Sequence, residues 1–381
     1  MNDFPKSSAR KVTIYDSTLR EGEQMPGIRF TIEQKTEIGS MLMEAGVPQI
    51  EAGFAAVSEG ERKAIKSIVA LGGDAEILSL SRTKKEDIDA ALSCDVDLIL
   101  LFIATSDLHM KKKLKMSEAQ VLDAIRSSVE YAKAHGVKVA LSGEDSTRSD
   151  RNFLKKAYSA AAESGADRLG ITDTLGCATP EMIEDLVEFV KGFSDLPISV
   201  HLHNDFGLAL ANALVAVDAG AKAVATTVCG FGERAGNVPL EQFVMAMKHL
   251  YESDLGISTE KLTPIARKVS QFAGIPLPPT QPWVGANAFA HESGIHVAAV
   301  LKDPSTYEFL PPETVGNARR IVMGKHSGRS LISARLGEKG VEAPKEQLDE
   351  IFRRIKELGE RKGDVTDREF WDIVDSVLKG S

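Results

Sequence analysis

Short apolar runs rich in β-branched residues alternate with longer stretches in which apolar residues recur every three or four positions. Eight such runs are predicted strands, and they cover residues 12–15, 49–54, 76–81, 96–104, 137–143, 167–172, 198–203 and 221–228. The intervening stretches predict helices, as over residues 31–46, 116–136 and 179–193, and several of these open on a capping residue and close on Gly. Eight strands that each precede a helix, all before residue 255, predict an α/β fold of the TIM type, a (β/α)8 barrel. The alternative is a doubly wound sheet.

The pattern changes from residue 255 onward. Residues 275–283, IPLPPTQPW, hold four of the 15 prolines of the chain and are typical of a linker. Residues 345–362 are amphipathic and predict a helix in which Glu350 and Arg354 pair. We therefore expect a catalytic barrel over residues 1–255, a linker subdomain over 256–315 and a helical C-terminal subdomain over 316–381.

Composition narrows the class of protein. No run approaches 18 apolar residues, and the N-terminal segment lacks the apolar core of a signal peptide. Three scattered cysteines, Cys94, Cys177 and Cys229, suit a reducing cytoplasm and predict neither disulfides nor a cysteine-rich zinc site. The formal charge of −9 argues against nonspecific nucleic-acid binding. The dense basic run Lys111 to Lys115 is predicted to be a solvated loop or helix start. These features indicate a soluble cytoplasmic protein with no membrane or nucleic-acid partner.

Polar residues collect where the predicted strands end, and in a (β/α)8 barrel the active site forms at the C-terminal ends of the strands. In strand order these residues are Asp16, Arg20, Glu21 and Gln24; Glu51; Ser81 and Arg82; Thr105, Ser106 and His109; Glu144 and Asp145; Asp173 and Thr174; and His201 and His203. The eighth strand leads into GFGERAGN, residues 230–237, whose glycines permit a tight turn. Because any strand exit meets water, this gathering favours an enzyme without establishing one.

Two histidines end the seventh predicted strand. Side chains alternate faces along a strand, so His201 and His203 point the same way. An isolated pair of this kind is more often hydrogen-bonded than bound to metal. Glu21 and the amide oxygen of Asn237, from other strand exits, can complete a ligand set, and with them a metal site becomes the favoured interpretation. Imidazoles with hard oxygen ligands suit Mg²⁺, Mn²⁺ or Zn²⁺ in a catalytic site with open positions.

Other charged groups have two interpretations. Arg20 either forms a salt bridge with the adjacent Glu21 or stands as a fixed cation that stabilises negative charge on a carbonyl oxygen. In HESGIH, His291 and His296 lie in a segment that could fold over the barrel mouth, although core or surface histidines are the default there.

Motifs spread over residues 11 to 330 resemble those of the homocitrate synthase and 2-isopropylmalate synthase family. In order they are DSTLREGEQ, TSDLHMKKKL, SGEDSTRSD, DTLGCATP, HLHNDFGLALAN, GFGERAGN, HESGIH, DPSTYE and KHSGR. Hydroxymethylglutaryl-CoA lyases and pyruvate-carboxylating domains share the first motif and the two-histidine strand. They generally lack GERAGN combined with HESGIH, so the synthases are the better match.

The resemblance implies a role for particular residues. Those it assigns to a divalent metal are Glu21, His201, His203 and Asn237. It makes Arg20 catalytic and places Thr174 against the oxo acid. It assigns proton transfer to Glu144 with His296, and it makes Tyr307 the residue that supports this histidine. It also implies a homodimer in which the tail segments carrying His296 and Tyr307 cross onto the barrel of the partner.

The reaction implied by the resemblance is a Claisen-type condensation of acetyl-CoA with a 2-oxo acid, followed by thioester hydrolysis. DSTLREGEQ and the short chain favour homocitrate synthesis from 2-oxoglutarate or a related dicarboxylate. TSDLHMKKK instead resembles 2-isopropylmalate synthases, and 2-isopropylmalate or citramalate synthesis is the alternative. Arg82, Arg148 or one of Lys111 to Lys113 could bind the distal carboxylate of 2-oxoglutarate. A lyase or aldolase on the same barrel, and a non-catalytic binding barrel, remain further hypotheses.

Overall fold

The structure, a computed structural model, describes residues 11–379 and divides into two compact units. One unit ends at Leu277 and the other begins at Pro278. Helix α10 (Leu262–Ala273) belongs to the first unit, where it packs on α1 (Ile32–Glu44), and the division between the units falls within the proline-rich segment. No helix among residues 11–379 is long and apolar enough to cross a membrane.

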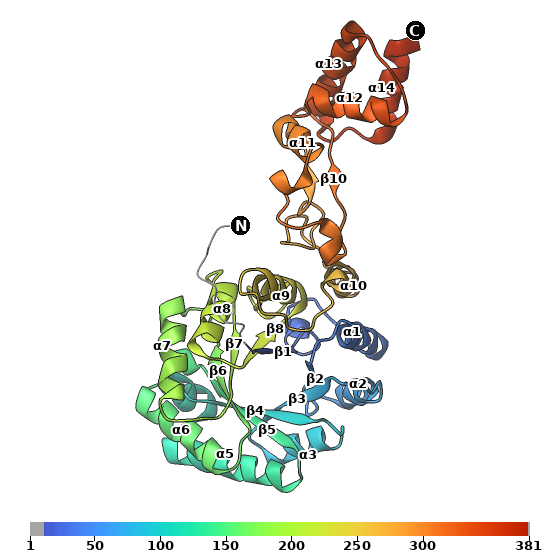
Figure 1. Cartoon of the computed structure of the whole chain (residues 1–381). Coiled ribbons are helices and arrows are strands. Elements are labelled where there is room, and N and C mark those ends of the chain that lie inside the picture. Colours follow the sequence, from blue (N-terminus) through green and yellow to red (C-terminus); the bar gives the residue numbers. More distant parts are fainter. Residues whose placement is uncertain (1–10, 380–381) are drawn as a thin grey trace. The chain divides into compact units, whose positions relative to one another are not determined.

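The first unit is a closed barrel of eight parallel strands, as the alternating pattern predicts (Figure 1). Each strand pairs with the next along the chain, and β1 pairs with β8 to close the barrel. The strands are β1 (Thr13–Asp16), β2 (Gln49–Gly53), β3 (Glu76–Arg82), β4 (Leu98–Ala104), β5 (Lys138–Glu144), β6 (Arg168–Asp173), β7 (Ile198–Leu202) and β8 (Ala223–Thr226).

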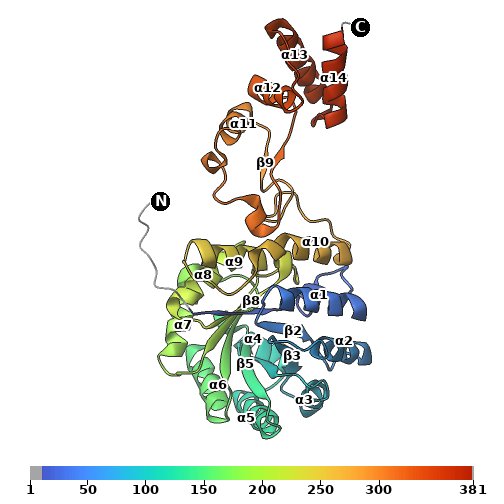
Figure 2. The same ribbon diagram turned by 45° about the vertical axis from the view of Figure 1, so that its right-hand side comes forward.

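Helices surround the barrel and cover the outer face of its strands (Figure 2). Besides α1 they are α2 (Glu59–Val69), α3 (Lys85–Leu92), α5 (Glu118–Ala134), α6 (Arg151–Glu163), α7 (Pro180–Lys191), α8 (Ala209–Ala219) and α9 (Leu240–His249), with a short α4 (Asp107–His109) after β4. Capping boxes fix the starts of α1 and α5, where Thr31 exchanges hydrogen bonds with Gln34 and Ser117 with Gln120. The basic run after α4 is one π-helical turn, Met110–Leu114.

The lumen of the barrel is filled from several strands. The buried side chains that pack there are Tyr15, Leu78, Leu80, Leu98, Leu100, Ala140, Ala223 and Ala225, with Phe54 and Phe102 partly buried against them. Large residues from β1, β3 and β4 thus meet small residues from β5 and β8.

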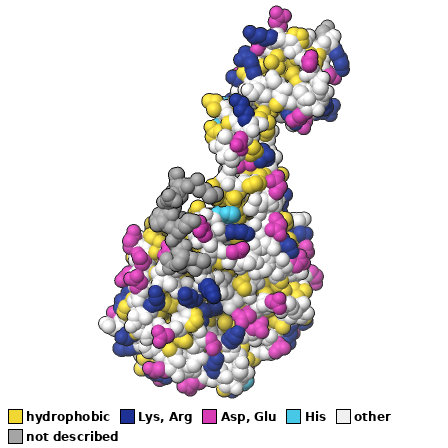
Figure 3. All heavy atoms as spheres, in the orientation of Figure 1, with side chains coloured by type: hydrophobic (Ala, Val, Ile, Leu, Met, Phe, Trp, Pro, Cys, Tyr) yellow, Lys and Arg dark blue, Asp and Glu magenta, His cyan; other side chains and the backbone are white. Residues whose placement is uncertain are grey.

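The second unit is mainly helical. It contains α11 (Gly294–Val300), α12 (Arg329–Glu338), α13 (Lys345–Lys362) and α14 (Asp367–Lys379), and a two-stranded sheet of β9 (Ala290–His291) with β10 (Arg320–Ile321). Its core centres on Val297, Ile332, Ile351, Ile355 and Phe370. The predicted pair on α13 is present, with Arg354 Nε 2.7 Å from Glu350 Oε1. On the face drawn in Figure 3, acidic and basic side chains are interspersed.

Candidate active site

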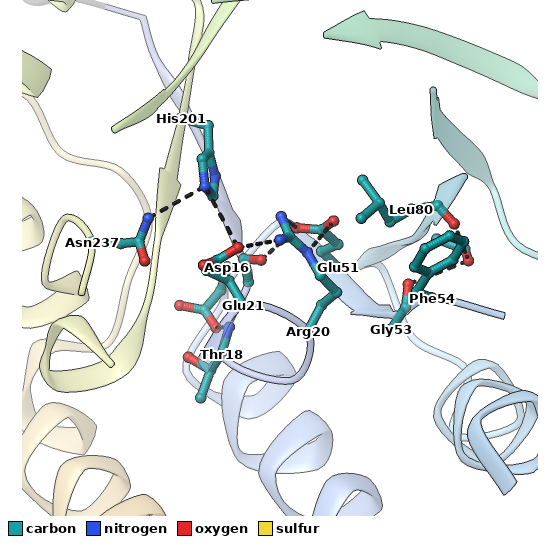
Figure 4. Close-up of polar contacts among 12 residues, drawn as sticks. Asp16, Thr18, Arg20, Glu21, Glu51, Gly53, Phe54, Leu80, His201 and Asn237 are labelled. Atoms are coloured by element: carbon teal, nitrogen blue, oxygen red, sulfur yellow. Dashed lines mark hydrogen bonds and ion pairs between the residues drawn. The ribbon is translucent and has the colours of Figure 1, made fainter. Parts of the chain in front are cut away.

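The loop after β1 holds the guanidinium of Arg20 between two carboxylates (Figure 4). Arg20 donates from Nε to Glu51 Oε1 at 2.8 Å and from Nη2 to Glu51 Oε2 at 3.0 Å, while its Nη1 donates to Glu21. Glu51 is fully buried on β2 and also accepts a hydrogen bond from Ser17 Oγ at 2.5 Å. Burial acts to lower the pKa of Arg20, but Glu51 and Glu21 outweigh it and raise this pKa. The guanidinium is thus a permanent, fixed cation.

Glu21, His201 and His203 form one buried cluster. One potential ligand atom from each of the three lies within 4.8 Å of the other two. His201 Nε2 is 3.7 Å from Glu21 Oε2, and His203 Nε2 is 3.9 Å from Glu21 Oε1. The two rings come from the end of β7, as the alternation of side chains predicts, and their centroids are 5.1 Å apart. Spacing of this kind fits three ligands around one ion.

The protonation states of the cluster also suit a metal. Burial acts to raise the pKa of Glu21, but Arg20 outweighs it and the pKa falls to about 2. Burial lowers the pKa of His201 to about 3 and also lowers the pKa of His203. At neutral pH the cluster therefore contains a carboxylate and two neutral imidazoles, which are the forms that ligate metal ions.

Asn237 lies against this cluster because the loop after β8 turns sharply. A Cβ at Gly236 would lie 1.9 Å from the backbone oxygen of Gly230, so the loop requires glycine there. A Cβ at Gly232 would lie 1.9 Å from Asn237 Oδ1, so glycine at this position leaves room for the amide side chain. Asn237 Nδ2 lies 3.3 Å from His201 Nε2 and donates to the backbone oxygen of Leu202. Its Oδ1 is buried and has no hydrogen-bond partner among the described residues. This free oxygen fits a fourth metal ligand.

A cavity of about 260 Å³ lies beside the cluster. The residues that line it are Tyr15, Arg20, Glu21, Gln24, Phe54, Leu80, Leu100, Phe102, Lys113, Ser142, Glu144, Thr172, His201 and Glu233. It combines the charged groups of the strand exits with an apolar wall from β3, β4 and the residue that follows β2. Such a site fits a small ligand that combines charge with a carbon chain.

Glu144 lies at the cavity. Its Oε1 accepts a hydrogen bond from Lys113 Nζ at 2.6 Å and lies 3.4 Å from His109 Nδ1. Lys113 therefore differs from the rest of the basic run, which was expected to be merely solvated, because its ammonium group faces the cavity.

Arg82 and Thr174, both expected at the substrate, do not line this cavity. Arg82 is half-exposed, and Asp87 accepts hydrogen bonds from its Nε at 2.6 Å and its Nη2 at 2.9 Å. Thr174 Oγ1 accepts from the backbone nitrogen of Asp145, whose carboxylate binds Arg148. Asp87 thus holds Arg82, and Asp145 holds Arg148, away from the cavity.

His296 and Tyr307, expected to act together, lie together in the second unit. Their rings stack with centroids 4.0 Å apart and an angle of 26° between planes. The other histidine of the motif, His291, has its Nε2 3.2 Å from Glu308 Oε1 and is a hydrogen-bonded structural residue, which was the default interpretation.

Three side chains at or next to the site have no role predicted from the sequence. Glu51 was noted only as a strand exit, although it orients Arg20. Tyr15 and Arg168 were not noted at all. The available signal for Tyr15 was side-chain alternation along β1, where Tyr15 and Asp16 are adjacent and therefore point to opposite faces. Arg168 gave no signal, because a charged residue at a strand start is usually exposed.

Known proteins share both the sequence and the fold. The HMGL-like family profile matches residues 11–269, and that of the homocitrate synthase post-HMGL domain-like family matches residues 283–363. The chain is 54% identical to homocitrate synthase AksA of Methanopyrus kandleri over 97% of its own length and 93% of that protein. It is 50% identical to 2-isopropylmalate synthase of Sulfurisphaera tokodaii, over 93% of its own length and 92% of that protein.

A hydroxymethylglutaryl-CoA lyase from Bacillus subtilis has a similar fold, with a TM-score of 0.64 and 22% identity, over 72% of this chain and 97% of the lyase. The barrel is therefore of the kind found in these lyases. The sequence identity to both synthases extends over the second unit as well. The chain therefore belongs to the family of the homocitrate and 2-isopropylmalate synthases, enzymes built on an HMGL-like barrel.

Proposed function

We propose that this protein condenses the acetyl group of acetyl-CoA with a 2-oxo acid and then hydrolyses the thioester to release CoA. The 2-oxo acid that we expect first is 2-oxoglutarate or a related dicarboxylate, which would make the protein a homocitrate synthase. One observation carries the proposal: the buried cluster of Glu21, His201 and His203 lies with Arg20 at a cavity sized for a small acid. The high identity to a homocitrate synthase supports the same substrate class.

Residues at the cavity have the chemistry that the first half of the reaction needs. Glu21, His201, His203 and the amide oxygen of Asn237 would hold a divalent ion, Mg²⁺, Mn²⁺ or Zn²⁺, which would supply Lewis acidity toward the carbonyl of the oxo acid. Arg20 is fixed by Glu51 and can donate to the carbonyl oxygen as it gains negative charge.

A base must remove a methyl proton from acetyl-CoA before the new carbon–carbon bond forms. We assign this step to His296, supported by the stacked ring of Tyr307 and by Glu144 at the cavity. Glu144 belongs to the barrel unit, whereas the other two residues belong to the second unit. We propose that they meet in a homodimer in which each second unit serves the barrel of the partner.

The apolar wall of the cavity favours a second candidate, 2-isopropylmalate or citramalate synthesis. Phe54, Leu80, Leu100 and Phe102 would accept the branched chain of 2-oxoisovalerate without any cation. Chain length does not separate the two candidates, because the chain covers nearly all of a 2-isopropylmalate synthase as well as of a homocitrate synthase.

The deciding experiment gives the purified protein acetyl-CoA, Mg²⁺ or Mn²⁺, and a panel of 2-oxo acids, and follows free thiol. The panel contains 2-oxoglutarate, 2-oxoisovalerate, pyruvate and oxaloacetate. We expect metal-dependent thiol release with 2-oxoglutarate. If none of the acids elicits thiol release with either metal, the synthase proposal is wrong, whereas release with only 2-oxoisovalerate or pyruvate would support the second candidate.

A matched pair of histidine variants tests the metal ligands. His203→Ala removes one imidazole of the cluster and is expected to abolish metal-dependent turnover while the protein stays folded. His135→Ala removes an exposed imidazole at the end of α5 and should leave turnover unchanged. Full turnover in His203→Ala, with circular dichroism like that of the wild type, would contradict the ligand assignment.

A further inference from the structure

Arg168 is a buried cation that forms no direct ion pair with a carboxylate of the described chain; burial lowers its pKa and outweighs Glu76 and Glu51, which act to raise it from a greater distance. It begins β6, is 6% exposed, and donates from Nη1 to Gln49 Oε1 at 2.8 Å. Its Nε and Nη2 are buried and have no hydrogen-bond partner among residues 11–379, and no carboxylate of these residues lies within ion-pair distance. By contrast, the buried Arg20 pairs with two carboxylates. A buried guanidinium with two nitrogens that lack hydrogen bonds is costly, so a further anion near Arg168 would be stabilised.

The ring of Tyr15 lies between Arg168 and the cavity. The guanidinium carbon of Arg168 is 5.1 Å from the centroid of this ring, and Tyr15 itself lines the cavity. The side chain is buried, yet no described residue forms a hydrogen bond with its hydroxyl group. The other fully buried tyrosine, Tyr158, donates to the backbone oxygen of Gly170 at 2.6 Å. Burial raises the pKa of Tyr15, so its hydroxyl remains protonated and can donate.

Small residues and hydroxyl groups surround this part of the lumen. Ala140 on β5 lies directly beside Arg168 in the sheet register and adds no bulk. Ser142 and Thr172 bring hydroxyl groups to the cavity from β5 and β6. A Cβ at Gly170 would lie 2.2 Å from Ser142 Oγ, so this glycine keeps the space that the serine occupies. The same cavity that reaches Glu21 and His201 therefore also offers uncharged donors backed by a positive charge.

We propose that the Tyr15 hydroxyl group, with the Arg168 guanidinium behind its ring, receives the second carboxylate of a 2-oxo dicarboxylic acid. The inference rests on the proposed function and assigns the substrate class of that same site. A carboxylate can accept a hydrogen bond from the Tyr15 hydroxyl group and is attracted by the charge of Arg168. A branched apolar chain can do neither. The other candidate cations are already committed: Arg82 to Asp87, Arg148 to Asp145, and Lys113 to Glu144.

Tyr15→Phe removes one hydroxyl group and little else. The assay compares 2-oxoglutarate with 2-oxovalerate, which has the same chain length and ends in a methyl group. Because a hydrogen bond to a charged group is lost, we expect the ratio of kcat/KM for 2-oxoglutarate over 2-oxovalerate to fall about ten- to a hundredfold. Tyr131→Phe removes a surface hydroxyl group on α5 and should leave the ratio unchanged.

Arg168→Gln tests the positive charge as a positioning group. We expect Arg168→Gln to raise the KM for 2-oxoglutarate while kcat changes little. The rise in KM should be smaller when Arg168→Gln is introduced into the Tyr15→Phe variant. The melting temperature of each variant shows whether it is folded. If Arg168→Gln does not fold, the isosteric Tyr15→Phe still decides.

Two outcomes would overturn the inference while leaving the proposed function intact. One is an unchanged substrate ratio in Tyr15→Phe, and the other is a wild-type protein that prefers 2-oxovalerate to 2-oxoglutarate. Absence of thiol release from the wild type with every acid would instead remove the proposed function, and the inference would fall with it.

Discussion

Replacing Gly232 with alanine should weaken metal binding without unfolding the barrel. The added Cβ would lie 1.9 Å from Asn237 Oδ1 and 3.1 Å from its Cγ. Real contacts of this kind are no shorter than about 3.0 Å, so the amide oxygen must retreat by about 1.1 Å. Gly232 does not have a left-handed backbone, so alanine introduces no backbone strain.

The size of the effect follows from this displacement. Metal–ligand distances hold to within about 0.2 Å, and the amide would move several times farther than that. Loss of a residue that ligates or orients ligands reduces metal affinity about 10- to 100-fold. Because the amide is the end of a flexible side chain, we expect the free energy of unfolding of the metal-free protein to change by less than about 1 kcal/mol.

Mn²⁺ titration of the metal-free protein, followed by electron paramagnetic resonance or calorimetry, measures the affinity directly. Gly60→Ala is the control, since a Cβ in this part of α2 meets only Ser58 Oγ at 3.7 Å. In an Asn237→Ala background the Gly232→Ala change should add little, because the clash is with the asparagine itself. Wild-type Mn²⁺ affinity in Gly232→Ala would refute the reasoning and remove Asn237 from the ligand set.

Three further variants test other parts of the structure. Glu51→Gln breaks a buried ion pair with Arg20, so it should destabilise the protein by about 3 kcal/mol in urea unfolding and reduce kcat about 100-fold; equal stability would contradict the pairing. Burial raises the pKa of Asp16 from 3.8 to about 6, so this carboxyl group stabilises the fold below pH 3.8 and that contribution is lost as pH rises through 6. Asp16→Asn is neutral at every pH, so its free energy of unfolding relative to that of the wild type should increase by up to about 3 kcal/mol between pH 4 and pH 7.5. A difference in urea midpoints that does not change with pH would contradict this. Tyr307→Ala removes the ring stacked on His296 and should lower kcat about tenfold or more with a change in stability of about 0.5 kcal/mol or less, whereas unaltered kcat would exclude support of the histidine.

The strands and the shared direction of two candidate ligands, His201 and His203, could be predicted because both depend on local periodicity. The predicted strand over residues 198–203 is one residue longer than β7 (Ile198–Leu202). His203 lies just beyond it and forms a backbone bridge with Asn237 from the loop after β8. Alternation placed His201 and His203 on one face, and the bridge brings the fourth candidate ligand to them. Predicted ligands from distant motifs therefore converge because adjacent parallel strands end at the same edge.

Substrate contacts could not be predicted in the same way, because position at a strand exit does not fix where a side chain points. Arg82 ends β3 and Lys113 lies beyond the end of β4, but Asp87 holds Arg82 away from the cavity while Lys113 reaches Glu144 at its rim. Arg168 was missed for the opposite reason. It opens a strand at the other end of the barrel, where charge usually meets water, and only closure of the barrel places it behind Tyr15.

The two buried arginines differ in the charge that surrounds them, and this difference separates their roles. Arg20 forms ion pairs with two carboxylates, which largely neutralise its charge. Its main contribution to a ligand is therefore a hydrogen-bond donor of fixed orientation. Arg168 forms no direct ion pair in the described chain, although Glu76 and Glu51 act on it from a greater distance, and its guanidinium lies against the ring of Tyr15, where the low dielectric of the lumen strengthens its field. A dicarboxylate that spans the cavity can satisfy both, with its reacting end at Arg20 and its second carboxylate toward Arg168. A monocarboxylate can interact only with Arg20. We infer that the different charge environments of the two arginines are the physical basis of substrate choice in this barrel.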